Sequence, residues 1–218
     1  MTTIVCEMKS SHIDEARLFL AEHFNKHEPL LQTPGIQLPK ASPDPKRREY
    51  HESVIRQGCS LIVVDQSNDD RIVGVAYAGV LNASELEQNW LELSEKRRTQ
   101  PMEHIEYFLC NIKRNARLFQ QYGVTDALYL KMIAVDSSMR RQGLGRRLVT
   151  ALIDVGRTKG FPLLVATCTG LYSTRLMASL GMECVHSEDY VAFKDEDGNV
   201  VLKPPAPHTK ASVMALKL

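Results

Sequence analysis

Apolar positions recur along the chain with two different periods, which predicts that strands and helices follow one another. Residues 3–8 are rich in β-branched side chains and predict a first strand. Ser10 and Ser11 then offer an N-cap to a helix. The apolar positions of that helix recur at helical spacing, at Ile13, Ala16, Leu20 and Phe24.

The middle of the chain predicts a loop, a hairpin and several helices. Prolines at positions 29, 34, 39, 43 and 45 predict an irregular loop over 25–45. The turn-forming residues 67–70 separate two β-rich runs, which indicates an antiparallel hairpin. The expected elements are a polar helix at about 45–57, strands at 60–65 and 72–80, and helices at about 84–98 and 103–121, broken near Pro101.

The second half of the chain predicts alternating strands and helices. A strand at 127–135 (ALYLKMIAV) leads directly into a turn rich in arginine and glycine. The next helix places Leu144, Leu148, Leu152 and Val155 on one face and ends at Gly160. The later expected elements are strands at 163–167 and 182–186, a helix at 172–180 that Gly181 ends, and a tail in which 190–193 pairs with 212–216.

This order of elements predicts a mixed α/β (α+β) fold. An antiparallel N-terminal part runs into a strand–helix–strand–helix–strand half, which suits a mixed central sheet with helices on both faces. The chain has 218 residues, of which 44% are hydrophobic and 24% charged. These values suit a single domain over residues 1–218.

Charge and cysteine content narrow the possible functions. The chain has 27 Lys and Arg against 26 Asp and Glu, which disfavours nucleic acid and anionic membranes as partners. Its five cysteines are widely spaced without a C-x-x-C pair, so we expect reduced thiols. The seven histidines are scattered, and no metal site is expected. No apolar run approaches the ~20 residues that span a bilayer, which favours a cytoplasmic enzyme.

The turn from Arg140 to Gly145 (RRQGLG) predicts an anion site. A strand that ends here and opens into a helix leaves backbone N–H groups unpaired at the positive end of the helix dipole. Gly143 and Gly145 let the backbone approach a phosphate closely, and neighbouring arginines add positive charge. The pattern R-x-x-G-x-G lacks the Lys-Ser/Thr of a P-loop and the third glycine of the dinucleotide fingerprint. The alternative is an ordinary helix cap with solvated arginines.

This turn resembles the acetyl-CoA site of the GNAT acetyltransferase superfamily, in which (Q/R)-x-x-G-x-(G/A) after the fourth strand binds the pyrophosphate. The stretches KMIAVDSSMRRQGLGRRL (131–148), HEPL (27–30) and GLYSTR (170–175) resemble more narrowly the insect-type arylalkylamine N-acetyltransferases. The resemblance implies the GNAT fold, with a mostly antiparallel sheet splayed between its fourth and fifth strands. It also implies acetyl-CoA as co-substrate, no metal, a small-molecule amine as acceptor, and a monomer.

The resemblance implies that two segments contact acetyl-CoA. The strand before the turn would pair with the pantetheine arm, and the turn would hold the pyrophosphate. The implied contact residues are Met132, Ile133, Ala134, Val135, Arg140, Arg141, Gln142, Gly143, Leu144, Gly145 and Arg146.

Glu28 is the implied general base. An alkylamine with a pKa of ~10 is protonated at neutral pH, so acetyl transfer to it requires a base. Glu28 stands where the resembling family carries its general-base glutamate, and an apolar pocket would raise its pKa. A further family serine falls at Thr169, which keeps a hydroxyl. The alternative for Glu28 is a solvated glutamate that closes the first helix.

Ser173 and Tyr172 are the candidates for protonating the departing thiolate. Ser173 stands where the family carries its proposed general-acid serine, whereas Tyr172 is the better acid, with a pKa of ~10. Ser173 also suits a helix N-cap. The resemblance implies that Pro29 and His208 line the amine pocket, against the alternatives of a helix terminator and an exposed loop residue. Cys168 is expected to pack in the core rather than to act as a nucleophile.

The sequence therefore leads to one functional hypothesis and two alternatives. In the leading hypothesis, a small arylalkylamine or related amine attacks acetyl-CoA directly, with Glu28 as base. The first alternative keeps acetyl transfer but makes a polyamine, a protein N-terminus or a lysine the acceptor. The second alternative is a catalytically silent regulator that binds CoA.

Overall fold

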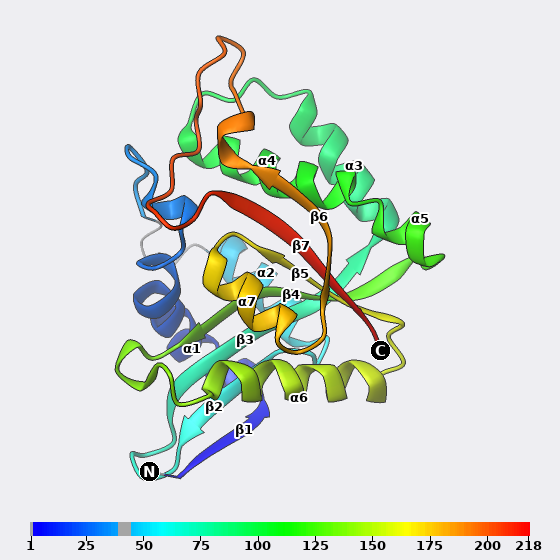
Figure 1. The fold of residues 1–218 in the computed structure, drawn as a ribbon. Coiled ribbons are helices and arrows are strands. Elements are labelled where there is room, and N and C mark those ends of the chain that lie inside the picture. Colours follow the sequence, from blue (N-terminus) through cyan, green and yellow to red (C-terminus); the bar gives the residue numbers. More distant parts are fainter. Residues whose placement is uncertain (1, 39–44) are drawn as a thin grey trace.

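Seven strands form one mixed sheet in the part of the chain that the structure describes, which is residues 2–38 and 45–218 of a computed structural model (Figure 1). The order across the sheet is β1-β2-β3-β4-β5-β7-β6, and the β4–β5 pair is parallel. The strands are β1 (Thr3–Glu7), β2 (Leu61–Asp65), β3 (Arg71–Asn82), β4 (Asp126–Val135), β5 (Leu163–Cys168), β6 (Glu183–Asp189) and β7 (Lys210–Lys217). The helices are α1 (Ile13–Leu20), α2 (Pro45–Ile55), α3 (Ala83–Ser94), α4 (Pro101–Asn115), α5 (Leu118–Tyr122), α6 (Leu144–Thr158) and α7 (Leu171–Ala178).

Each face of the sheet is covered by its own helices, because alternate side chains of a strand point to opposite faces. Val63 of β2 and Leu164 of β5 pack in a core with α6 and α7. On the opposite face, Val75 of β3 packs with α1 and α2. Val165 of β5 points to that opposite face as well and packs with α3, α4 and α5. Figure 1 shows α6 and α7 together on the near side of the sheet. The predicted mixed sheet with helices on both faces is confirmed.

The β4 and β5 strands separate partway along their length. Backbone pairing joins Leu128–Leu130 of β4 to Leu164–Ala166 of β5 and stops there. Lys131 is an extra residue in β4, because the register with β3 shifts at this point. A bulge of this kind bends a strand and ends its pairing. The predicted splay is therefore confirmed, and residues 132–135 of β4 keep an edge that pairs with no strand in the described chain.

The N-terminal elements differ from the prediction at their ends. Ser10 and Ser11 form part of a 3-10 turn (Ser10–His12), and neither side chain caps α1, so the predicted cap is wrong. The reason is that α1 begins only after His12, beyond the reach of both serines. The following segments are a π-helical turn (Ala21–Asn25) and a 3-10 turn (Leu30–Gln32), whereas positions 39–44 of the predicted loop lie outside the described residues.

The helix predicted at 103–121 is two helices, α4 and α5. Arg117 between them has a φ of 47°, and this left-handed conformation interrupts the helix. The sequence carries no glycine or proline at this point to announce the break. The preceding helix, expected to reach residue 98, ends at Ser94.

The strand predicted at 190–193 is wrong. Tyr190–Ala192 form a 3-10 turn, and the antiparallel partner of β7 on this side is β6. Tyr190 is 2% exposed, and its hydroxyl donates a hydrogen bond to the Thr169 carbonyl oxygen at 2.5 Å. Burial of this ring and the bond of its hydroxyl hold the segment after β6 in a turn, which overrides its strand propensity.

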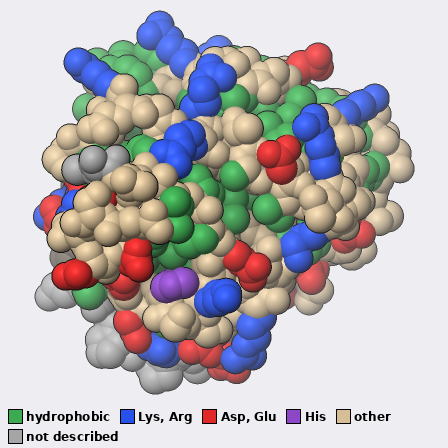
Figure 2. Space-filling model, turned by 90° about the horizontal axis from the view of Figure 1, so that it is seen from below, with side chains coloured by type: hydrophobic (Ala, Val, Ile, Leu, Met, Phe, Trp, Pro, Cys, Tyr) green, Lys and Arg blue, Asp and Glu red, His purple; other side chains and the backbone are tan. Residues whose placement is uncertain are grey.

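The face seen from below carries the edge of the sheet. Figure 2 shows hydrophobic side chains gathered in the middle of this face, with acidic and basic side chains interspersed around them. Ile4 of the edge strand β1 is 40% exposed, and Leu18 of α1 is 63% exposed.

Among the helices that the structure describes, none has the length and apolar character to cross a membrane.

Asp136 fixes the point at which β4 passes into the turn. Asp136 is 4% exposed, and its Oδ1 accepts hydrogen bonds from the Ser138 N–H (2.9 Å) and hydroxyl (2.7 Å). Its Oδ2 pairs with Arg71 Nη2 at 3.0 Å. Burial opposes ionisation, but the bonds from Ser138 and the charges of His23 and Arg71 hold the pKa of Asp136 below its usual value.

Replacement of this carboxylate, Asp136→Asn, is expected to lower the free energy of unfolding at pH 7 by about 1–3 kcal/mol, the usual effect of losing buried hydrogen bonds to a charged group. Because the folded-state pKa is lowered, this stabilisation is present above the unfolded-state pKa and is lost as the pH falls through the folded-state value. The difference from wild type should therefore shrink toward about pH 3. Urea unfolding at both pH values measures it.

The matched control is Asp70→Asn, at an exposed turn position whose φ of 51° suits asparagine. This control should stay within about 0.5 kcal/mol of wild type at both pH values. An Asp136→Asn difference of equal size at pH 7 and at low pH would contradict the assignment of the stabilisation to the ionised carboxylate.

Candidate active site

The turn between β4 and α6 opens the amino end of the helix. Gly143 is the N-cap residue, and its φ of 79° lies in the left-handed region that glycine adopts without strain. No side chain caps α6, and the N–H groups of Leu144, Gly145 and Arg146 have no acceptor within the described chain. Unpaired N–H groups and the helix dipole favour an anion here. The predicted anion site thus has the local structure that its chemistry requires.

Four arginines lie in the turn and in the first residues of α6, and they divide into two pairs. Arg146 Nη2 donates to the Ser179 hydroxyl at the end of α7 (3.0 Å), and Arg147 donates to the Thr3 hydroxyl (2.6 Å) and carbonyl (2.8 Å) of β1. These two side chains hold α6 against its neighbours. Arg140 and Arg141 are exposed and remain available to an anion.

Arg140 also connects the turn to the segment that carries Glu28. The pKa of His27 is lowered by burial and, next in weight, by the charge of Arg140. The guanidinium of Arg140 therefore lies close to the residue that precedes Glu28. The structure brings the predicted anion site and the predicted base into one region, although Arg140 and Glu28 are 112 positions apart in the sequence.

Glu28 is buried, so the alternative of a solvated surface glutamate is wrong. The residue is 8% exposed, and its Oε2 accepts a hydrogen bond from the Leu31 N–H at 2.8 Å. Oε1 is buried and has no hydrogen-bond partner among the described residues. Burial raises the pKa of Glu28, and the Thr169 hydroxyl and the N–H groups of Leu31 and Leu30 oppose this rise only in part.

Gly170 gathers the other residues of the predicted amine pocket. A Cβ at Gly170 would lie 2.8 Å from His208 Nδ1 and 3.0 Å from Pro29 Cγ, so both rings pack directly on its backbone. The Leu171 N–H donates to His208 Nδ1 at 3.1 Å, and burial lowers the pKa of His208, which keeps the ring neutral as an acceptor. The ring of Tyr172 meets the ring of His208 edge-on, with centroids 5.6 Å apart. Pro29, His208 and Tyr172 therefore form one cluster.

Ser173 does not cap α7, because the N-cap residue is Gly170 and no side chain bonds the first turn. The Ser173 hydroxyl instead donates back to the Gly170 carbonyl at 3.0 Å. It also lies beside the Cys168 thiol, as does the hydroxyl of Thr174. Tyr172, the other candidate acid, is 66% exposed.

Cys168 has the environment of a packing residue. It is 2% exposed, and burial raises its pKa to about 12, an effect that the hydroxyls of Ser173 and Thr174 only partly offset. A thiol with such a pKa supplies almost no thiolate at neutral pH. All five cysteines are free. Within the described ranges, no three His, Cys, Asp or Glu side chains are grouped so as to hold a metal ion.

Glu28 and Ser173 lie against opposite faces of the sheet at the end of β5. Two neighbours of Glu28, Leu30 and Tyr190, belong to the core that α3 and α4 cover. The neighbour of Ser173, Cys168, belongs to the core beneath α6 and α7. The gap between β4 and β5 thus separates a buried carboxylate on one side from a hydroxyl on the other.

Sequence reasoning missed three contributors to this region. The sequence predicts a strand at Tyr190, whereas the structure places the Tyr190 hydroxyl near the Glu28 carboxyl. Gly170 carried no separate expectation, although a glycine that ends a strand and opens a helix is a signal for close packing. The sequence places Lys131 in a strand and at the start of the stretch 131–148, but nothing in its local pattern announces a bulge.

The splayed sheet, the uncapped N-terminus of α6 and the buried carboxylate of Glu28 lie in one region of the fold. The model of the GNAT acetyltransferase family matches residues 27–182, well over half of the chain. This chain belongs to the GNAT acetyltransferase family.

Solved structures of insect amine acetyltransferases share the whole fold. The polyamine N-acetyltransferase of Drosophila melanogaster, which catalyses the formation of N-acetylagmatine, is 25% identical, and the match covers 100% of both chains with a TM-score of 0.85. Arylalkylamine N-acetyltransferase 2 from Aedes aegypti is 24% identical, with 100% of this chain and 99% of that chain covered and a TM-score of 0.88. The mosquito arylalkylamine N-acetyltransferase-like 5b is 21% identical over 100% of both chains, with a TM-score of 0.85.

The substitution Gly170→Ala places a methyl group against His208 and Pro29 and forces these side chains to move. It is expected to lower kcat/KM for acetyl transfer by about 10- to 100-fold, because a shift of about 1 Å misaligns reacting groups. The φ of −142° at this position suits alanine, so the effect arises from the new methyl group against His208 and Pro29. Steady-state kinetics and a thermal melt measure it. Ala178→Gly, at the exposed end of α7, controls for a simple loss of helix stability and should keep its activity. An unchanged kcat/KM in Gly170→Ala would contradict the close packing of the cluster.

Proposed function

We propose that this protein transfers the acetyl group of acetyl-CoA to the primary amine of a small arylalkylamine or related amine, by direct attack with Glu28 as general base. The observation that carries the proposal is the Glu28 carboxyl, which is buried, has a raised pKa and keeps one oxygen without a partner. Such an oxygen can accept a proton from an ammonium group and stabilise its positive charge.

The chain offers a surface that fits acetyl-CoA. The unpaired edge of β4 over 132–135 can bond the amides of an extended pantetheine arm, and it leads to the open N-terminus of α6. Arg140 and Arg141 add positive charge beside that N-terminus. The bound co-substrate supplies the thioester that an amine nitrogen attacks.

The two groups proposed to transfer protons lie on opposite faces of the sheet. Glu28 holds and orients the incoming amine through its free Oε1 and takes a proton from the nitrogen. Ser173, across the end of β5, is the first candidate to give a proton to the departing thiolate, and Tyr172 is the second. The high pKa of Cys168 supports direct transfer over a covalent enzyme intermediate.

Removing the base, with Glu28→Gln, is expected to lower kcat/KM by about 10²- to 10⁴-fold, the range typical of general-base catalysis. In the wild type the rate should fall as the pH drops through the raised pKa of Glu28, because only the ionised carboxyl accepts a proton. The variant should lose this limb of the pH profile and keep only the titration of the amine. Thiol release from acetyl-CoA measures both.

The matched control is Glu22→Gln, at an exposed glutamate on the same N-terminal segment that pairs with Lys26. This control should keep its activity. The folded-state pKa of Glu28 is raised, so its ionisation at pH 8 destabilises the fold, and Glu28→Gln should melt no lower than wild type there. An unchanged pH profile in Glu28→Gln would contradict the role of Glu28.

A panel of arylalkylamines, agmatine and polyamines tests the wider proposal. Amine-dependent thiol release with at least one of them is expected. If calorimetry detects acetyl-CoA binding while every amine leaves the thioester intact, the proposal fails and a silent CoA-binding regulator is supported instead.

The two candidate acids are separable by mutation. Ser173→Ala is expected to lower kcat by about 10-fold, at the low end of the range for general-acid assistance, since a thiolate is a good leaving group. Tyr172→Phe should lower kcat less than twofold, because the Tyr172 side chain is mostly exposed. Single-turnover kinetics with acetyl-CoA and a reactive amine measure the chemical step. A larger loss in Tyr172→Phe than in Ser173→Ala would reverse the assignment.

A further inference from the structure

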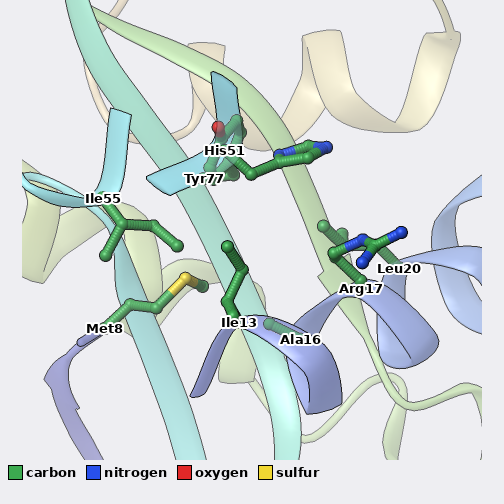
Figure 3. Close-up of a pocket in the computed structure, with 8 residues that line it drawn as sticks. All are labelled: Met8, Ile13, Ala16, Arg17, Leu20, His51, Ile55 and Tyr77. Atoms are coloured by element: carbon green, nitrogen blue, oxygen red, sulfur yellow. The ribbon is translucent and has the colours of Figure 1, made fainter. Parts of the chain in front are cut away.

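A row of aromatic and cationic side chains runs from β4 to β3 on the face of the sheet that α2 covers. Lys131, the bulged residue of β4, donates from Nζ to Tyr50 Oη at 3.3 Å. Its Nζ also lies 5.5 Å from the ring centroid of Tyr129 and 5.8 Å from that of Tyr50. The row continues from Tyr50 to His51 and on to Tyr77, with ring centroids 5.8 Å and then 5.2 Å apart. Figure 3 shows His51 and Tyr77 beside each other at the margin of a small, mainly apolar cavity.

This row reaches the candidate active site at Tyr129. The Tyr129 hydroxyl donates to Thr167 Oγ1 at 3.2 Å, which joins β4 to β5 at the start of the gap. Thr169 follows two residues later, about 7 Å further along the chain, and its hydroxyl approaches the carboxyl of Glu28. Lys131 and Glu28 therefore lie on the same side of the sheet and flank the same gap. An acceptor whose amine meets Glu28 can extend its tail past Thr167 toward Lys131.

The positive charges beside Tyr129 have no acidic partner in the described parts of the chain. Lys113 of α4 places its Nζ 5.0 Å from the Tyr129 ring centroid. Neither Lys113 nor Lys131 forms an ion pair with an Asp or Glu side chain of the described residues. Both side chains are half-buried. The two ends of this region therefore differ in charge, with an acid at Glu28 and ammonium groups around Tyr129.

We propose that Lys131 is a specificity-determining residue: with Tyr50 and Tyr129 it selects acceptor amines whose tail is aromatic and uncharged and rejects those whose tail carries a second positive charge. The inference rests on the proposed amine acetyltransferase function. Tyrosine rings pack well against an aromatic tail. An ammonium or guanidinium at the far end of an acceptor meets the charge of Lys131 instead, and repulsion over about 6 Å at an effective dielectric constant near 20 weakens binding by about 10- to 100-fold.

The test compares kcat/KM for tyramine, which has an uncharged aromatic tail, with kcat/KM for agmatine, which has a guanidinium tail. Wild type is expected to favour tyramine by at least about 10-fold. Lys131→Glu should shift this ratio toward agmatine by about 10-fold or more, and Lys131→Gln should shift it by a smaller factor in the same direction. The matched control is Lys217→Gln, because Lys217 also lies over a tyrosine ring, that of Tyr122, but at the opposite end of the sheet.

The outcomes separate this inference from the proposed function. The inference alone is overturned if wild type, Lys131→Gln and Lys131→Glu turn over amines with the same ratio of kcat/KM for tyramine and agmatine. It is also overturned if the wild type prefers agmatine. An equal shift in Lys217→Gln also overturns it, because the effect would then be that of net charge. No turnover of any amine by the wild type overturns the proposed function and this inference with it. Circular dichroism checks folding, and Lys131→Gln decides the question where Lys131→Glu fails to fold.

Discussion

The early end of pairing between β4 and β5 is the constraint on which the rest of the candidate site depends. A continuous parallel pair would satisfy the backbone of both strands, but the bulge at Lys131 turns β4 away after three paired residues. The open edge of β4 then leads to the uncapped N-terminus of α6. At the same gap, Glu28 lies on the face of the sheet that α3 and α4 cover, and Ser173 lies on the face of α6 and α7. One backbone irregularity thus leaves a stretch of β4 unpaired between the two faces on which Glu28 and Ser173 lie.

The two buried carboxylates of this region have opposite environments. Asp136 receives hydrogen bonds from Ser138 and pairs with Arg71, so its pKa lies below the usual value and its charge stabilises the fold. Glu28 has one bonded oxygen and one without a partner, a condition that costs about 1–3 kcal/mol. Burial raises the pKa of Glu28, and its few hydrogen-bond donors offset this rise only in part.

The elements that follow local rules could be predicted, and those fixed by distant contacts could not. The turn and helix after β4 were predictable because glycine at a helix N-terminus and a regular apolar stripe are both properties of neighbouring residues. The segment at Tyr190 was mispredicted because its turn depends on a buried ring and a bond to Thr169, far away in the sequence. Residues near Arg117 gave no sign of a break. The importance of Glu28 came from family resemblance, since no local pattern reports that a carboxyl will be buried.

Gly170 connects the Glu28 segment and the start of α7 through one backbone position. Its carbonyl accepts the hydroxyls of Ser173 and Thr174, which fixes the first turn of α7 on one face of the sheet. Its Cα side packs against Pro29 and His208, which fixes the Glu28 segment on the other face. A side chain at this position would have to move one of these neighbours, so the spacing between the Glu28 segment and Ser173 depends on the absence of a Cβ. The spacing between the Glu28 segment and the first turn of α7 is therefore a property of backbone contact, which long and mobile side chains could not hold as firmly.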